Sequence, residues 1–231
     1  MCHDVAVTEP NIRIDLAEAH RRAWDHLASP GTWWTAAERI ELASTVRLAI
    51  DDDEPVPPWV GVTSTDRLPS DRVAPDAAHD VAYRIGRHAG TITSDIARSA
   101  MDAIGPLPYV ELCAIASSVA AVVHFCRNVG IDVPAFPDPI DGEPSRERPE
   151  LAVAELNWVP VAAPADQTAA VVQAYTAVPA EHANTWRMAA AQYMPDAEMV
   201  HPDWMRRAGG LTRAQMELVA ARVAKLRECF Y

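Results

Sequence analysis

The sequence predicts an all-α fold, and three observations support this prediction. Apolar residues recur at spacings of three and four along most of the chain, which is the period of an amphipathic helix. Runs that alternate in the manner of β-strands are nearly absent. Two segments open with the Thr-x-x-Glu/Gln pattern of a helix capping box, Thr35 with Glu38 and Thr212 with Gln215.

The helical period is interrupted twice by prolines. The expected helices lie at residues 14–29, 35–50, 76–88, 94–104, 109–129, 166–175, 180–193 and 211–231. Residues 51–75 and 131–164 contain five and seven prolines, which do not fit inside helices, so both are expected to be irregular. We interpret the second as a linker partly ordered by Trp158. The helix over residues 109–129 is the most apolar and is expected to lie at the centre of a core.

A weak internal repeat suggests two tandem units. The two capping boxes are 177 residues apart, and at the same offset Leu42, Ala43 and Val46 correspond to Val219, Ala220 and Val223. We therefore expect an N-terminal unit in residues 1–130, a proline-rich linker in 131–164, and the start of a second, incomplete unit in 165–231.

Composition excludes several classes of protein. A net charge of −12 argues against a surface that follows nucleic-acid phosphates. We find no apolar run of about 20 residues, so no membrane span is expected, and the N-terminus does not have the pattern of a secretory signal. A cytoplasmic location follows as the default, where the four cysteines are expected to be thiols.

The last expected helix carries the residues with the most specific spacing. Met216, Val219, Val223, Leu226 and Phe230 recur at helical spacing and form one apolar stripe. Glu217 lies beside this stripe, and Cys229 follows 12 residues later, just before Phe230 and Tyr231.

This segment resembles the start of the redox signature of the AhpD-like and carboxymuconolactone-decarboxylase-like superfamily. In that family a helical Glu precedes Cys-x-x-Cys by 12 residues, and a His follows four residues after the second Cys. Glu217, Cys229 and Tyr231 match the pattern, whereas the second Cys and the His would be residues 232 and 236. The N-terminal half is similar to alkylhydroperoxidase-related members, some of them selenoproteins. The matching residues are Trp24, residues 30–35, Glu38, Arg39 and residues 109–112.

The resemblance implies a helical AhpD-like fold and a thiol- or selenol-dependent peroxidase or disulfide oxidoreductase. Cys229 would be the redox sulfur and Glu217 the acid of a proton relay. It also implies a peroxide substrate, a protein or small-molecule thiol as reductant, a homo-oligomer, and no bound cofactor. We hypothesise that residue 232 is selenocysteine or a lost cysteine, which the codon after Tyr231 tests. The 231 residues alone are then expected to have little activity and to expose apolar surface.

Two other functions remain open. One is a non-catalytic helical scaffold that oligomerises through apolar faces. The other is a lyase of the decarboxylase branch that uses acid–base residues such as Glu111 and His124. More simply, Glu111 is a charge near a helix N-terminus and His124 a hydrogen-bonded core histidine.

The remaining cysteines and acidic residues are expected to be structural. Cys113 and Cys126 are expected to be core cysteines. The first unit has Asp52-Asp53-Glu54-Pro55 where a Cys-x-x-Cys would fall, and Ile40 where Glu217 maps, so we expect it to be redox-inactive. No cluster of His or Cys with ligand spacing is present, so no metal site is expected.

Overall fold

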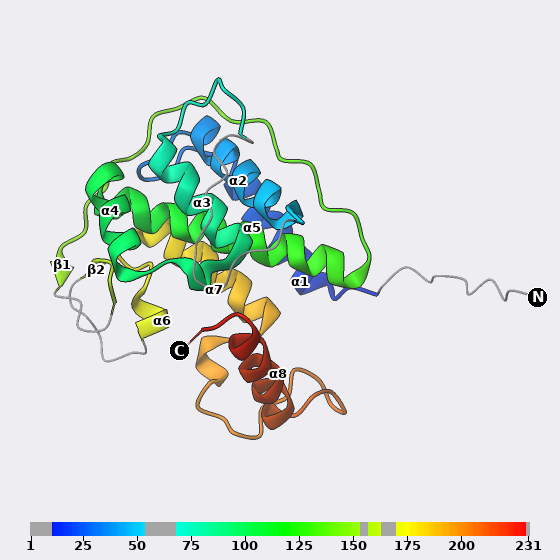
Figure 1. Cartoon of the computed structure of the whole chain (residues 1–231). Coiled ribbons are helices and arrows are strands. Elements are labelled where there is room, and N and C mark those ends of the chain that lie inside the picture. Colours follow the sequence, from blue (N-terminus) through cyan, green and yellow to red (C-terminus); the bar gives the residue numbers. More distant parts are fainter. Residues whose placement is uncertain (1–10, 54–67, 153–156, 163–169, 230–231) are drawn as a thin grey trace, which may run out of the picture.

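The protein is mostly helical, as the sequence predicts. The structure, a computed structural model, describes residues 11–53, 68–152, 157–162 and 170–229. Within these residues lie eight α-helices and one short antiparallel ribbon (Figure 1). The helices are α1 (Ile14–His26), α2 (Ala36–Asp51), α3 (Asp76–His88), α4 (Ser94–Ile104), α5 (Pro106–Val129), α6 (Ala170–Gln173), α7 (Pro179–Gln192) and α8 (Arg213–Leu226), and the strands are β1 (Leu151–Ala152) and β2 (Val161–Ala162).

The predicted helix ends are close to the observed ones, and the differences have local causes. Helices α3 and α4 have the predicted bounds. Helix α1 ends three residues before the predicted end, in a turn that precedes Pro30. Helix α5 starts at Pro106 rather than residue 109, because Gly105 with φ 94° separates it from α4 and proline is well suited to a first helical position. Helix α6 covers only part of its predicted range, much of which lies outside the described residues.

Both predicted capping boxes are confirmed. The Thr35 hydroxyl accepts a hydrogen bond from the Glu38 backbone at 3.3 Å, and the Glu38 carboxylate accepts one from the Thr35 backbone at 2.8 Å. The Thr212 hydroxyl accepts from the Gln215 backbone at 3.3 Å, and the Gln215 side chain accepts from the Thr212 backbone at 2.9 Å. Each box satisfies two N–H groups that a helix N-terminus otherwise leaves free.

Helix α5 is the centre of the core. Helices α2, α3 and α4 pack on it, and α7 reaches it from the other part of the chain (Figure 1). Thirteen of its 24 residues are buried, including Leu112, Ile115 and Val119. Contrary to the expectation from sequence, α5 is long and apolar enough to cross a membrane. However, 67% of its most apolar window is buried inside the protein, as in the core helix of a soluble protein.

The proline-rich segment after α5 packs against the turn between α1 and α2. The backbone N–H groups of Ile140 and Ser145 donate to the carbonyls of Ala28 and Gly31, at 2.7 and 3.1 Å. The Phe136 ring stacks on Trp24, with 4.8 Å between the ring centroids. These contacts fix residues 131–150 to the helices, whereas Trp158, which we expected to order the segment, is 52% exposed.

Helices α7 and α8 differ in how they join the bundle. Helix α7 packs against α1 and α5, so residues 179–192 share the core of the N-terminal helices. Helix α8 stands away from the other helices beyond the end of α7 (Figure 1), and none of its residues is buried. Its exposed apolar side chains are Leu218, Val219, Val223 and Leu226, which are 54–72% exposed.

Candidate functional site

A groove of about 940 Å³ runs along α8 and contains Cys229. Side chains from α8 form an apolar floor, which consists of Met216, Val219, Ala220, Val223 and Ala224. The end of α7 and the loop before α8 form the opposite wall. Four arginines also line the groove, and these are Arg13, Arg206, Arg207 and Arg227. An exposed thiol, apolar surface and positive charge therefore meet in one place.

Cys229 is the exposed cysteine among those that the structure describes. Its backbone N–H donates to the Ala224 carbonyl at 2.9 Å, which turns the chain back at the end of α8. Cys113 is half-buried and Cys126 is buried, as expected for core cysteines. Burial raises the pKa of the Cys113 thiol to about 12 and also raises the pKa of Cys126, so both are poor nucleophiles. Cys2 lies outside the described residues.

The structure does not bring Glu217 and Cys229 together. The Glu217 carboxylate accepts a hydrogen bond from Arg213 Nε at 2.7 Å. Hydrogen bonds from Tyr193 and Arg213 hold the pKa of Glu217 below its usual value, so the carboxylate stays ionised. The Cys229 backbone lies beside Ala224, whose carbonyl accepts its N–H, and the seven residues from Glu217 to Ala224 correspond to ~10 Å along α8. Any proton transfer between them must therefore pass through other groups.

The groove is positively charged although the whole chain has a net charge of −12. Arg13 and Arg206 share one carboxylate, Asp15, at 3.0 and 3.2 Å. Arg227 donates to the imidazole of His124 at 2.9 Å, and Arg207 makes no ion pair with any described residue. Burial, and to a smaller extent the neighbouring charge of Arg13, hold the pKa of Arg206 below its usual value.

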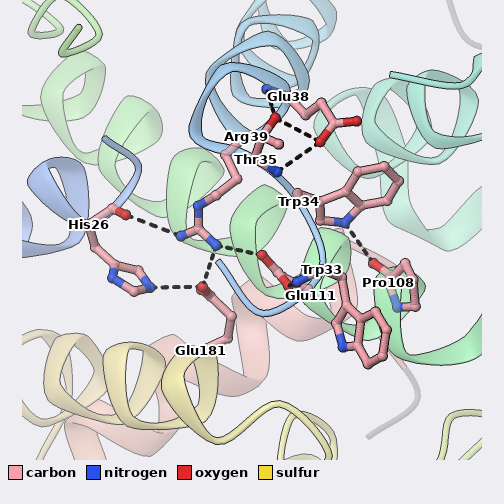
Figure 2. A network of polar contacts seen from close by, with 9 residues as sticks. All are labelled: His26, Trp33, Trp34, Thr35, Glu38, Arg39, Pro108, Glu111 and Glu181. Carbon is pink, nitrogen blue, oxygen red and sulfur yellow. Dashed lines mark hydrogen bonds and ion pairs between the residues drawn. The ribbon is translucent and has the colours of Figure 1, made fainter. Parts of the chain in front are cut away.

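A second concentration of titratable groups lies inside the helical bundle (Figure 2). The Arg39 side chain from α2 is fully buried and donates to the carboxylates of Glu111 on α5 and Glu181 on α7, at 2.6 and 2.7 Å. The Glu181 carboxylate also contacts His26 Nε2 at 2.8 Å, and the Glu111 carboxylate accepts a hydrogen bond from the Trp33 backbone at 2.6 Å. This network joins α1 and α2, which follow one another in the sequence, to α5 and α7, which come much later.

The two carboxylates of this network differ in their preference for a proton. Burial raises the pKa of Glu111 to about 7, and the nearby charge of Glu181 adds to the effect, although Arg39 opposes it. Burial also acts to raise the pKa of Glu181, but the charges of Arg39 and His26 outweigh it and hold that pKa below its usual value. Glu181, which has His26 as a second partner, is therefore stabilised as an anion more than Glu111 is.

This difference predicts a pH dependence of stability. The folded state holds the Glu111 proton up to pH about 7, whereas the unfolded chain releases it near 4.5. Glu111 therefore lowers the free energy of unfolding by about 2–3 kcal/mol as the pH rises from 4.5 to 7. Urea unfolding across this range should show the fall in the wild type, and Glu111→Gln should remove it. Parallel pH profiles for the two proteins would contradict the assignment. The lowered pKa of Glu181 has the opposite effect, because it adds to the free energy of unfolding at neutral pH. This contribution is lost as the pH falls below the ordinary pKa of a glutamate.

A second buried carboxylate–imidazole pair joins α2 and α3. His79 is 1% exposed, and its Nε2 lies 2.6 Å from the Glu41 carboxylate while its Nδ1 lies 2.8 Å from the Thr45 hydroxyl. The Glu41 carboxylate also accepts the backbone N–H groups of Val73 and Ala74. No described cysteine is among these contacts, so the pair has no sulfur to activate.

Glu111 and His124 are separated within α5. Glu111 is fully buried in the ion network, whereas His124 is half-buried and bonded to Arg227. Burial and the charge of Arg227 hold the pKa of His124 below its usual value. Thirteen residues of helix place the two side chains ~20 Å apart, so one small substrate cannot contact both. The interpretation of Glu111 as a helix-terminus charge missed its ion pair with Arg39.

The sequence interpretation did not identify Arg39, Glu181 or His26 as members of a network. The available signal was Glu111, which stands in the most apolar stretch of the chain and needs a buried partner there. Nothing in the local sequence shows that the partner is 72 residues earlier. Among the described residues there is also no group of three or more His, Cys, Asp or Glu side chains that could hold a metal ion.

Comparisons with protein-family models, curated proteins and solved structures find no match for this chain.

Proposed function

We propose that this protein is a thiol-dependent oxidoreductase of the AhpD-like type that reduces peroxides, with Cys229 as the reacting sulfur. One observation carries the proposal: Cys229 is exposed in a groove whose lining includes four arginines, while the described core cysteines are buried or half-buried with raised pKa values. An accessible sulfur in an electropositive setting is the environment in which a thiolate forms and reacts.

The reaction begins with attack of the Cys229 thiolate on one peroxide oxygen. The O–O bond breaks, the other oxygen leaves as an alcohol after taking up a proton, and Cys229 becomes a sulfenic acid. A thiol of the reductant then attacks the sulfenic sulfur, which releases water and forms a mixed disulfide. A second thiol of the reductant attacks this disulfide and restores the Cys229 thiol. A cytoplasmic location, where thiols remain reduced, fits this cycle.

Glu217 belongs to the same proposal as the acid of the proton relay that the resemblance implies. Its ionised carboxylate can accept a proton, but two turns of α8 separate it from Cys229, so it acts on the sulfur only through intermediate groups such as water in the groove. A single thiol in the groove also depends on an external thiol in every cycle. Turnover by these 231 residues is therefore expected to be slow. A selenol or a second thiol next to Cys229 would raise the rate of turnover.

The test is peroxide-dependent oxidation of Cys229. The reduced protein is treated with an alkyl hydroperoxide in the presence of dimedone, which traps sulfenic acids, and the labelled cysteine is identified by mass spectrometry. We expect the adduct on Cys229, its loss in Cys229→Ser, and its retention in Cys126→Ser. Peroxide consumption in the presence of a dithiol should likewise be lost in Cys229→Ser and retained in Cys126→Ser. No adduct on Cys229, or the same peroxide consumption in Cys229→Ser, would contradict the proposal.

A second candidate, a helical interaction module, is favoured by a comparison of α2 with α8. At the offset of 177 residues, the counterparts of Val219, Ala220 and Val223 are Leu42, Ala43 and Val46, which are 0% exposed. Val219 and Val223 are 58% and 54% exposed. A second copy of the chain or another protein could cover this face. This candidate would be favoured if sedimentation analysis showed self-association that Val223→Asp abolishes, and if Cys229 formed no sulfenic acid with peroxides.

A further inference from the structure

The groove along α8 combines two features, an apolar floor and a group of arginines. Its floor is an open apolar strip from Met216 to Ala224. On its wall, Arg13, Arg206 and Arg207 together have Asp15 as their one carboxylate partner among the described residues. Arg13 and Arg206 also donate to backbone carbonyls at the end of α7, whereas Arg207 has no ion pair with a described residue. The volume of about 940 Å³ lies within the range of about 300–1,000 Å³ that is typical for small-molecule sites.

The two features together select the chemistry of a ligand. Three guanidinium groups against one carboxylate leave an excess of positive charge, which attracts an anion even though the chain is acidic overall. A planar carboxylate suits the fork of a guanidinium, because both of its oxygens can accept N–H bonds. A small inorganic anion would leave the apolar strip exposed to water. An alkyl chain that covers the strip contributes about 25 cal/mol of favourable free energy for each Å² of apolar surface removed from water.

We propose that the groove binds a long-chain fatty carboxylate. The carboxylate lies against Arg207, with Arg206 and Arg13 behind it, and the alkyl chain lies along Val219 and Val223 towards Cys229. For its role as a substrate this inference rests on the proposed function, because the peroxide that reaches Cys229 is then a fatty-acid hydroperoxide. The binding itself does not depend on the sulfur.

Binding is tested with laurate, which contains no peroxide, kept below its micelle concentration. Isothermal titration should give saturable binding of one laurate per chain, with 1-dodecanol binding at least about tenfold more weakly because it lacks the charge. Arg207→Gln should weaken laurate binding about fivefold to tenfold. Val223→Asp should weaken it about 30-fold or more, because it places an unpaired charge on the apolar floor.

Matched controls come from the same helix. Arg222 and Leu218 are exposed on α8 but do not line the groove, so Arg222→Gln and Leu218→Asp should bind laurate as the wild type does. All four positions are exposed, so each variant should keep the wild-type melting temperature. Equal affinity for laurate and dodecanol, equal weakening in the controls, or self-association through this face without laurate binding would overturn the proposal.

The variant Cys229→Ser separates this inference from the proposed function. It should still bind laurate saturably, because the carboxylate contacts the arginines and not the thiol. If laurate binds as described and Cys229 forms no sulfenic acid with peroxides, the binding site stands and the redox function is wrong. If Cys229 is oxidised by peroxides and laurate does not bind, the redox function stands and the binding proposal is wrong.

Discussion

Arg39→Met is expected to lower the free energy of unfolding by about 3–5 kcal/mol. The Arg39 side chain is fully buried and is the shared counter-charge of Glu111 and Glu181, which are also buried. Methionine keeps a similar length and apolar character but removes the positive charge. Two carboxylates then remain in the interior without a guanidinium, and burying an unpaired charge is among the most costly changes in a protein.

The measurement is chemical denaturation followed by circular dichroism. The matched control is Arg47→Met in the same helix. Arg47 is on the surface and donates to the Pro134 carbonyl at 3.3 Å, so its loss should cost less than about 1 kcal/mol. If Arg39→Met proves too unstable to purify, the triple variant with Glu111→Gln and Glu181→Gln provides a second test. It removes the unpaired charges and should be more stable than Arg39→Met alone. Equal stabilities of Arg39→Met and Arg47→Met would contradict the role of the network.

The local features of the fold were predictable because neighbouring residues cause them. The capping boxes at Thr35 and Thr212 depend on residues three positions apart, and both are present. The apolar period predicted α3 and α4 to the residue. The start of α5 was missed by three residues, since the glycine and proline that set it precede the apolar run from which the prediction began.

The sequence predicted less well which apolar faces are covered. Periodicity shows that Val219 and Val223 share a face of α8, as Leu42 and Val46 share one of α2, but it does not show whether another element lies on that face. In α2 the face is buried and in α8 it is open.

The candidate site was predictable for its sulfur and not for its charges. The spacing of Glu217 and Cys229 directed attention to α8, where Cys229 is exposed. The arginines of the groove come from two separate parts of the chain, before α1 and around α8, and only folding places them together. The partners of the buried Glu111 are likewise on α2 and in the loop before it, so the network depends on packing that no local pattern reports.

Gly31→Ala should be nearly as damaging as the loss of Arg39, with a decrease of about 3 kcal/mol in the free energy of unfolding. A Cβ at position 31 would lie 2.8 Å from the carboxylate carbon of Glu111, and closer still to its Oε1 atom and to the Arg39 guanidinium. These atoms cannot move aside freely, because each is held by buried hydrogen bonds at 2.6–2.7 Å. The backbone of the turn before α2 must shift instead, which strains the ion network.

The control for this change is Gly90→Ala, where a Cβ would lie 3.3 Å from the exposed carboxylate of Glu228, which can rotate away. Its effect should stay within about 0.5 kcal/mol. A double-mutant cycle identifies the cause of the Gly31 effect. On a Glu111→Ala background Gly31→Ala should cost at least 1 kcal/mol less than in the wild type, because the nearest obstructing atom is gone. Strict additivity would show that Gly31 is required for the shape of the turn rather than for space beside the carboxylate. The close packing of this turn onto the Arg39–Glu111 pair would then have no part in stability.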